Sequence, residues 1–123
     1  MAAGTYNFTI EQGATFKRRL TWSYTDPATG QEEPNNLTGF TVKMQIRDLP
    51  TDPNILLELS TENGKITVDA GVGQINLTLS ALETSKITKW REGYYDIIVT
   101  SPLGEVTRLL QGKIAVSYGI TKK

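Results

Sequence analysis

The 123 residues include no histidine and no cysteine. Histidine has the side chain whose ordinary pKa lies closest to physiological pH, and cysteine supplies the thiolate that attacks substrates and binds zinc. Their absence closes the commonest routes to nucleophilic catalysis, to proton transfer near neutral pH and to tight transition-metal binding. It also excludes disulfide bonds, which fits a protein that assembles in the cytosol. The sequence therefore favours a scaffold or binding module over an enzyme.

The chain also lacks an excess of either charge, with 13 Lys and Arg against 13 Asp and Glu. Nucleic acid binding needs a local excess of cations, so we expect no nucleic acid partner. No apolar run approaches the roughly 20 residues that span a bilayer, and the Met1–Gly4 start lacks the features of a signal peptide, so we expect no membrane partner. The one basic run, Lys17–Arg19, is interpreted as a solvated face or a sheet edge.

What the sequence does contain is alternation of apolar and polar residues, the period of a half-buried β-strand. The clearest case is Phe40–Arg47, in which Phe, Val, Met and Ile alternate with Thr, Lys, Gln and Arg. The same parity argument predicts a set of side chains that face the core. They are Phe8, Phe16, Leu20, Trp22, Phe40, Val42, Met44, Ile46, Ile75, Leu77, Leu79, Ile97, Val99, Ile114 and Val116.

Turn residues separate these strands. The stretch Thr25–Asn36 has neither period nor large apolar residue and predicts a long exposed loop, and prolines predict a second loop over Asp48–Asn54. Asn63-Gly64 predicts a hairpin with a two-residue type I′ turn. Ser80–Glu83 has the spacing of a capping box and predicts a helical turn or two ending near Ile87. A last strand over Glu105–Tyr118 is expected to bend at Gly112.

About eight strands, one short helix and no alternation of strands with helices predict an all-β fold, an antiparallel immunoglobulin-like β-sandwich formed as a single domain over residues 1–123. Gly93-Tyr94-Tyr95 after the helical turn resembles the tyrosine corner of immunoglobulin-like domains. The resemblance implies that the Tyr95 hydroxyl bonds back to the backbone. Trp22 is the better candidate for a core tryptophan.

Paired carboxylates could act as the catalytic groups of a glycosidase, and the candidate pairs are Asp48 with Asp52 and Glu32 with Glu33. Both pairs lie in predicted exposed loops, which give no means of raising the pKa of a general acid. Asp48, Asp52 and Asn54 could offer oxygens to calcium, but turn chemistry explains these residues more simply. We therefore predict no catalytic residue, no cofactor and no metal site.

Trp90 is the one aromatic residue whose pattern does not demand burial, and it stands next to Arg91 and close to Tyr94. Exposed aromatic rings can stack on sugars or on a protein partner. Trp90, Arg91 and Tyr94 are accordingly the candidate contact residues. We expect contacts to be made by the two long connections and by the termini, Met1–Thr5 and Gly119–Lys123.

Several segments resemble the small tail-associated structural proteins of tailed bacteriophages and the immunoglobulin-like N-terminal domain of phage baseplate upper proteins. They are Phe8–Phe16 (FTIEQGATF), Asn36–Val42 (NLTGFTV) with Met44 and Ile46-Arg47, Gly93–Ile97 (GYYDI) and Gly112-Lys113. The resemblance implies a virion structural protein, assembled in the host cytoplasm, that acts as an adaptor in the tail, baseplate or fibre-attachment region. It implies other virion proteins as partners and several copies in a symmetric assembly. The alternative is a capsid decoration or carbohydrate-binding module.

Overall fold

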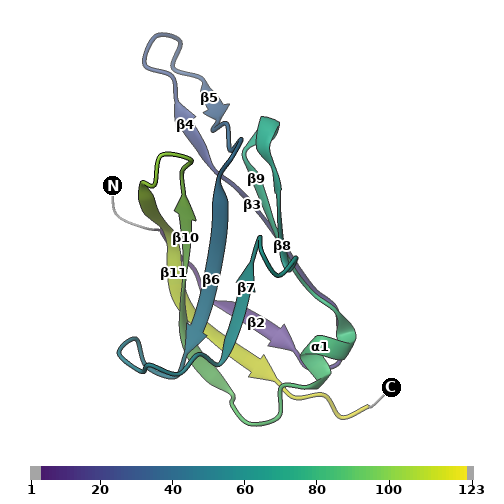
Figure 1. The fold of residues 1–123 in the computed structure, drawn as a ribbon. Coiled ribbons are helices and arrows are strands. Elements are labelled where there is room, and N and C mark those ends of the chain that lie inside the picture. Colours follow the sequence, from purple (N-terminus) through teal and green to yellow (C-terminus); the bar gives the residue numbers. More distant parts are fainter. Residues whose placement is uncertain (1–3, 122–123) are drawn as a thin grey trace.

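The computed structural model describes residues 4–121 (Figure 1). The strands are β1 (Gly4–Thr5), β2 (Phe8–Glu11), β3 (Phe16–Thr21), β4 (Ser23–Thr25), β5 (Glu32–Pro34), β6 (Thr41–Arg47), β7 (Leu57–Ser60), β8 (Ile66–Asp69), β9 (Gln74–Leu79), β10 (Glu92–Thr100) and β11 (Val106–Ser117). The helices are α1 (Ala81–Ser85) and the 3-10 turn η1 (Ala70–Val72). Among the described residues, no helix is both long enough and apolar enough to cross a membrane.

Two sheets face each other in the sandwich. The larger has the order β1-β11-β10-β6-β7, with β2 also on β11, and the smaller has the order β3-β9-β8. All pairs within them are antiparallel except β1 and β2, which run parallel to β11. This is the immunoglobulin-like arrangement. Strands β3, β9 and β8 correspond to immunoglobulin strands B, E and D, and β6, β10 and β11 correspond to strands C, F and G. The predicted fold class is confirmed, because two facing sheets of six and three strands, with one short α-helix, form an all-β sandwich close to the expected number of about eight strands.

The predicted inward-facing set forms the core. Twelve of its fifteen members are buried, while Leu20, Trp22 and Phe40 are partly buried and pack against the others. Trp22 packs edge-on against Phe40, with ring centroids 6.1 Å apart. Strand alternation was a sufficient guide here because one face of each strand meets the opposite sheet.

The predicted loop over Thr25–Asn36 is confirmed only in part, because residues 26–31 form a largely exposed turn while strands flank it. β4 and β5 pair there as a two-stranded hairpin that projects beyond the sandwich (Figure 1). The Asp26 carboxylate accepts a hydrogen bond from the Ala28 amide (2.9 Å) and so shapes the turn. The hairpin packs on no other layer, so nothing selects apolar residues at every second position and the alternation that marks a half-buried strand is missing.

The predicted hairpin at Asn63-Gly64 is wrong. β7 and β8 belong to different sheets, so the segment crosses between layers. Only Gly64 has a positive φ (79°), whereas a type I′ turn requires it at both central residues. The Asn63 carboxamide oxygen instead accepts from the amides of Ser60 and Lys65. The local signal for a chain reversal was correct, but it does not specify which strand the chain joins next.

The last strand is irregular at Leu109, not at the predicted Gly112. Ile97 pairs with Leu110 and Ile98 pairs with Arg108, which leaves Leu109 as the extra residue of a β-bulge. Gly112 has a different role, described below.

The basic run Lys17–Arg19 lies on β3, an edge strand of the smaller sheet, as predicted. The Arg18 guanidinium sits over the Phe16 ring, 4.6 Å from its centroid, and donates to the Lys17 carbonyl (2.7 Å). Its second amino group lies 3.4 Å from the Thr9 carbonyl on β2. Arg18 therefore covers the open edge between the two sheets.

The capping box of α1 is formed as predicted, although the helix ends at Ser85. The Ser80 backbone amide donates to the Glu83 carboxylate (3.0 Å), and the Glu83 amide donates to the Ser80 hydroxyl (3.1 Å). The Ser80 amide, together with Lys65 at 3.0 Å, holds the pKa of Glu83 below its ordinary value of 4.5. The carboxylate form is thus stabilised in the folded state.

We expect Glu83→Gln to be less stable than the parent at pH 7, with the difference shrinking as the pH falls. A carboxyl with a depressed folded pKa contributes its stability above the unfolded pKa and loses it as pH falls through the folded pKa. Glutamine keeps the capping geometry, so the variant removes only the charge. Urea denaturation of both proteins between pH 7 and about pH 3 checks this. A difference that does not change with pH would contradict it.

Candidate functional site: a groove on the outer face of the larger sheet

The edge of the larger sheet is interrupted at Tyr6-Asn7. Gly4 pairs with Leu110 and Phe8 pairs with Ile114, so β1 and β2 share one register along β11 and flank a local break. Within the break the Asn7 side chain accepts from the Lys113 amide (2.9 Å), in place of a backbone group. The Tyr6 carbonyl is thereby released from the ladder.

Gly112 and Tyr95 explain this break. They are cross-strand partners, and the Tyr95 hydroxyl donates to the Tyr6 carbonyl (2.5 Å). A Cβ atom on Gly112 would lie only 2.1 Å from that carbonyl oxygen, so glycine is what allows the close approach. Burial, and then the neighbouring Tyr6 phenol, raise the pKa of Tyr95, which keeps its hydroxyl protonated as a donor.

The Tyr95 hydroxyl bonds to backbone, as predicted, but the corner interpretation needs correction. An immunoglobulin tyrosine corner closes on backbone a few residues upstream. In this chain the acceptor lies 89 residues earlier, in the N-terminal segment. Tyr95 therefore anchors the first strand to the sheet instead of the connection before β10.

We expect Tyr95→Phe to lower the free energy of unfolding by about 1–3 kcal/mol, because the Tyr6 carbonyl loses its donor. Tyr94→Phe removes the same atom from the neighbouring ring, which is 37% exposed, and should change stability little. Chemical denaturation of the two variants measures the contrast. Equal losses would show that the hydroxyl of Tyr95 has no special partner.

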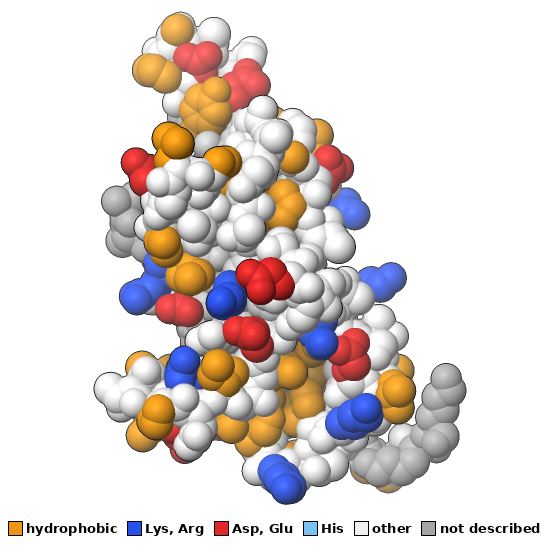
Figure 2. Space-filling model, in the orientation of Figure 1, with side chains coloured by type: hydrophobic (Ala, Val, Ile, Leu, Met, Phe, Trp, Pro, Cys, Tyr) orange, Lys and Arg blue, Asp and Glu red, His pale blue; other side chains and the backbone are white. Residues whose placement is uncertain are grey.

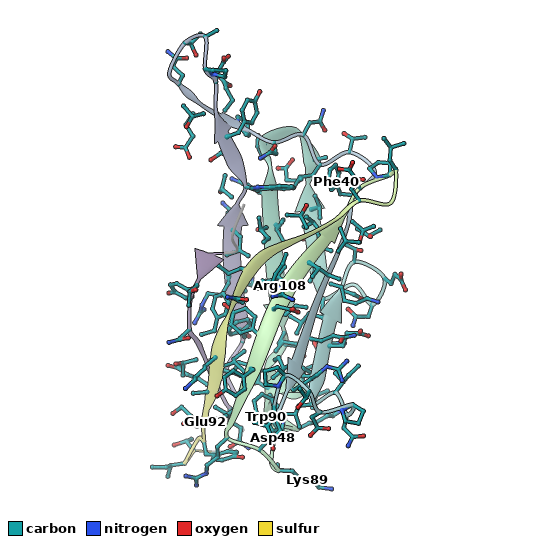
Figure 3. The ribbon with its side chains drawn as sticks, turned by 90° about the vertical axis from the view of Figure 1, so that its left-hand side faces the viewer. Phe40, Asp48, Lys89, Trp90, Glu92 and Arg108 are labelled. Carbon is teal, nitrogen blue, oxygen red and sulfur yellow. The ribbon has the colours of Figure 1, made fainter. Side chains whose placement is uncertain are left out.

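A groove of about 600 Å³ runs along the outer face of the larger sheet beside this anchor. Strands β6, β10 and β11 form its floor, and the β6–β7 loop and the N-terminal segment form its sides. Its lining residues are Thr5, Asn7, Gln45, Arg47, Pro50, Tyr94, Tyr95, Asp96, Arg108, Gln111, Gly112 and Lys113. Figure 3 looks toward this side of the molecule and shows Arg108 midway along the sheet.

Tyr94 lies between two cations at one end of the groove. Its cross-strand partners are Arg47 on β6 and Lys113 on β11. The Lys113 ammonium lies 5.5 Å from the centroid of the Tyr94 ring. Arg47 donates to the Asp52 carbonyl (2.7 Å) and to the Gln45 side chain (2.9 Å), which ties the β6–β7 loop to the sheet.

Asp96 occupies the next row of the groove. Its carboxylate lies 3.3 Å from Nε of Arg108, and Arg108 in turn lies 3.4 Å from the Gln111 side chain. Across the lining, three cations stand against the single carboxylate of Asp96, so two positive charges are in excess. The chemistry of this surface suits an acidic ligand that carries hydrogen-bond acceptors and can pack beside an aromatic ring.

The structure separates the three candidate contact residues. Tyr94 lies in the groove, whereas Trp90 and Arg91 are not among its lining residues, and Figure 3 shows Trp90 at the end of the sandwich opposite Phe40. Trp90 is partly buried against the core, although its sequence pattern does not demand burial, and its carbonyl accepts from the Tyr118 hydroxyl. Arg91 stacks over the Tyr118 ring at 5.0 Å. No local sequence pattern indicates the Trp90 contact, because Trp90 and Tyr118 are 28 residues apart along the chain.

The groove itself was not predicted, although its residues occupy the outward parity of the predicted strands. Such polar positions look like ordinary solvated faces until strand order shows which of them become neighbours.

Two of the four candidate carboxylates, Asp52 and Glu32, make hydrogen bonds that shape a turn and the projecting hairpin. Asp52 accepts from the Asn54 amide (2.9 Å), as turn chemistry predicts. Glu32 accepts from the Ser23 hydroxyl across the projecting hairpin. Over residues 4–121 no three acidic side chains gather as metal ligands do.

No model of a known protein family matches this chain, and no curated protein matches it.

Proposed function

We propose that this protein is a structural component of a tailed-bacteriophage virion, an adaptor that joins tail, baseplate or fibre proteins through its projecting hairpin. The resemblance of several sequence segments to phage tail proteins is the reason for proposing a virion component. The observation that carries the mechanism is the hairpin itself, a built element that leaves the sandwich and contributes nothing to its core.

The base of the hairpin is held firmly, which supports a contact role. The Trp22 amide donates to the Gly73 carbonyl (2.8 Å), and the Asn35 amide donates to the Trp22 carbonyl (2.9 Å). Gly73 has a φ of 63°, and a Cβ atom there would meet the Trp22 carbonyl at 2.6 Å. Two strands of the hairpin thus leave a tightly packed base in a fixed direction, as a preorganised contact element requires.

Exposed apolar side chains accompany the hairpin at its end of the molecule (Figure 2). Tyr24 on β4 is 50% exposed, and Leu103 in the β10–β11 turn is 93% exposed. Val72 in η1 and Val106 at the start of β11 are exposed as well. These side chains give the hairpin end apolar groups that another protein could cover.

The carbohydrate-binding alternative receives less support. Trp90 is partly buried, and the ring of Tyr94 has the Lys113 ammonium close to its centroid. The Trp90 ring is therefore less accessible than stacking on a sugar requires, and the Lys113 ammonium favours an acidic partner at Tyr94 over a neutral sugar.

The test is to remove the hairpin without disturbing its base. Replacing residues 23–34 by Asn-Gly makes Trp22 and Asn35 the first and fourth residues of a four-residue segment, so their hydrogen bond can close a β-turn. We expect an unchanged melting temperature and loss of the protein from purified particles. A matched control, Glu62→Lys, changes an exposed residue outside both the hairpin and the groove and should leave incorporation intact. Normal incorporation of the hairpin-less protein would reject the proposal.

A further inference from the structure

The charges of this neutral chain are unevenly placed. Residues 20–42 contain three acidic side chains, Asp26, Glu32 and Glu33, and no lysine or arginine. All three lie on the projecting hairpin, where Figure 2 shows red and orange side chains without blue. Among the described residues, none of the three forms an ion pair. The groove on the larger sheet carries the opposite excess.

The hairpin cannot reach the groove of its own chain. It extends away from the sandwich along the long axis, whereas the groove lies on the flank of the sandwich (Figures 1 and 3). Any pairing of the two must therefore join different molecules.

The two surfaces also match in chemistry beyond their net charge. Tyr24 and Glu33 are cross-strand partners, so one face of the hairpin presents a half-exposed phenol beside a carboxylate. The groove presents Tyr94 beside the Lys113 ammonium. Paired aromatic rings and opposed charges are the contacts that such faces make when they meet.

We propose that the groove on the outer face of the larger sheet binds the β4–β5 hairpin of a second copy of this chain. The inference rests on the proposed function in taking the hairpin as the contact element, and it names the partner. Hairpin and groove are different surfaces, so the contact is heterologous. A copy that inserts its hairpin into one neighbour still has its own groove free to bind the hairpin of another. Successive copies then form a ring if the rotation closes, or a filament if it does not.

Sedimentation velocity on the purified protein tests this at rising concentration. We expect species larger than a monomer at about 20 mM salt and their dissociation at about 500 mM salt, because the contact is electrostatic. The hairpin variant Glu32→Lys/Glu33→Lys and the groove variant Lys113→Glu/Arg108→Gln should each associate at least about tenfold more weakly. An equimolar mixture of the two variants should recover association. The basic hairpin of the first variant can bind the acidic groove of the second, and the unchanged hairpin of the second can bind the unchanged groove of the first.

Two controls reverse charges outside the contact. Glu62→Lys changes an exposed acid away from the hairpin, and Lys43→Glu changes an exposed cation of the larger sheet outside the groove. Both should associate as the parent does, and thermal melting should show every variant folded. A monomer at all concentrations in low salt, or a mixture that recovers nothing, would overturn the inference. If the hairpin-less protein nevertheless fails to enter particles, the adaptor function stands and its partner is a different virion protein.

Discussion

Leu77→Asp is expected to leave the protein unfolded at room temperature. Leu77 lies on β9, the central strand of the smaller sheet, and its side chain is fully buried. An unpaired carboxylate there costs several kcal/mol, against a total stability of about 5–15 kcal/mol for a domain of this kind. Circular dichroism during heating should show no cooperative transition.

Thr78→Asp provides the matched control, because Thr78 is the next residue on the same strand and its side chain is exposed. It should melt close to the parent. Val42→Asp tests the opposite layer in the same way, since Val42 is 1% exposed on β6. A Leu77→Asp protein that melts like the parent would refute the assignment of faces on which the core rests.

The second large effect is expected at Gly112. Alanine there would place its Cβ atom 2.1 Å from the Tyr6 carbonyl oxygen, which real structures do not tolerate. The N-terminal segment must move, and the hydrogen bond from Tyr95 is lost with it. We expect a loss of about 3 kcal/mol in the free energy of unfolding, measured by urea denaturation.

Gly71→Ala is the control for this substitution, because a Cβ atom on Gly71 meets nothing within 4 Å. It should be close to neutral. Amide hydrogen exchange adds a local measurement, since the Tyr6 amide donates to the Gln111 carbonyl (2.9 Å) and should lose protection only in Gly112→Ala. Equal stability of the two alanine variants would contradict the close approach.

The sequence was most informative where one physical requirement acts alone. Alternation over Phe40–Arg47 predicts β6. One face of this strand meets the apolar core and the other meets water, and successive side chains point to opposite faces. The capping box at Ser80 and Glu83 was equally readable, since both hydrogen bonds join groups three residues apart.

Features that depend on the order of strands in a sheet could not be predicted from local sequence patterns. The acceptor of the Tyr95 hydroxyl is fixed by which strand lies beside β11, and no spacing near Tyr95 encodes it. Asn63-Gly64 signals a reversal but not the sheet that receives the chain. The candidate groove depends on the neighbouring positions of β6, β10 and β11, so its residues became a site only when the strands were assembled.

Separation of the hairpin from the core has a consequence for how the protein diversifies. None of residues 23–34 is buried, so substitutions among them are largely uncoupled from the folding equilibrium. Selection can then rewrite the length, charge and aromatic content of this segment while the sandwich remains unchanged. Lineages of such a protein are expected to exchange binding specificity by replacing one short stretch of the gene, without the compensating core mutations that other surfaces would demand.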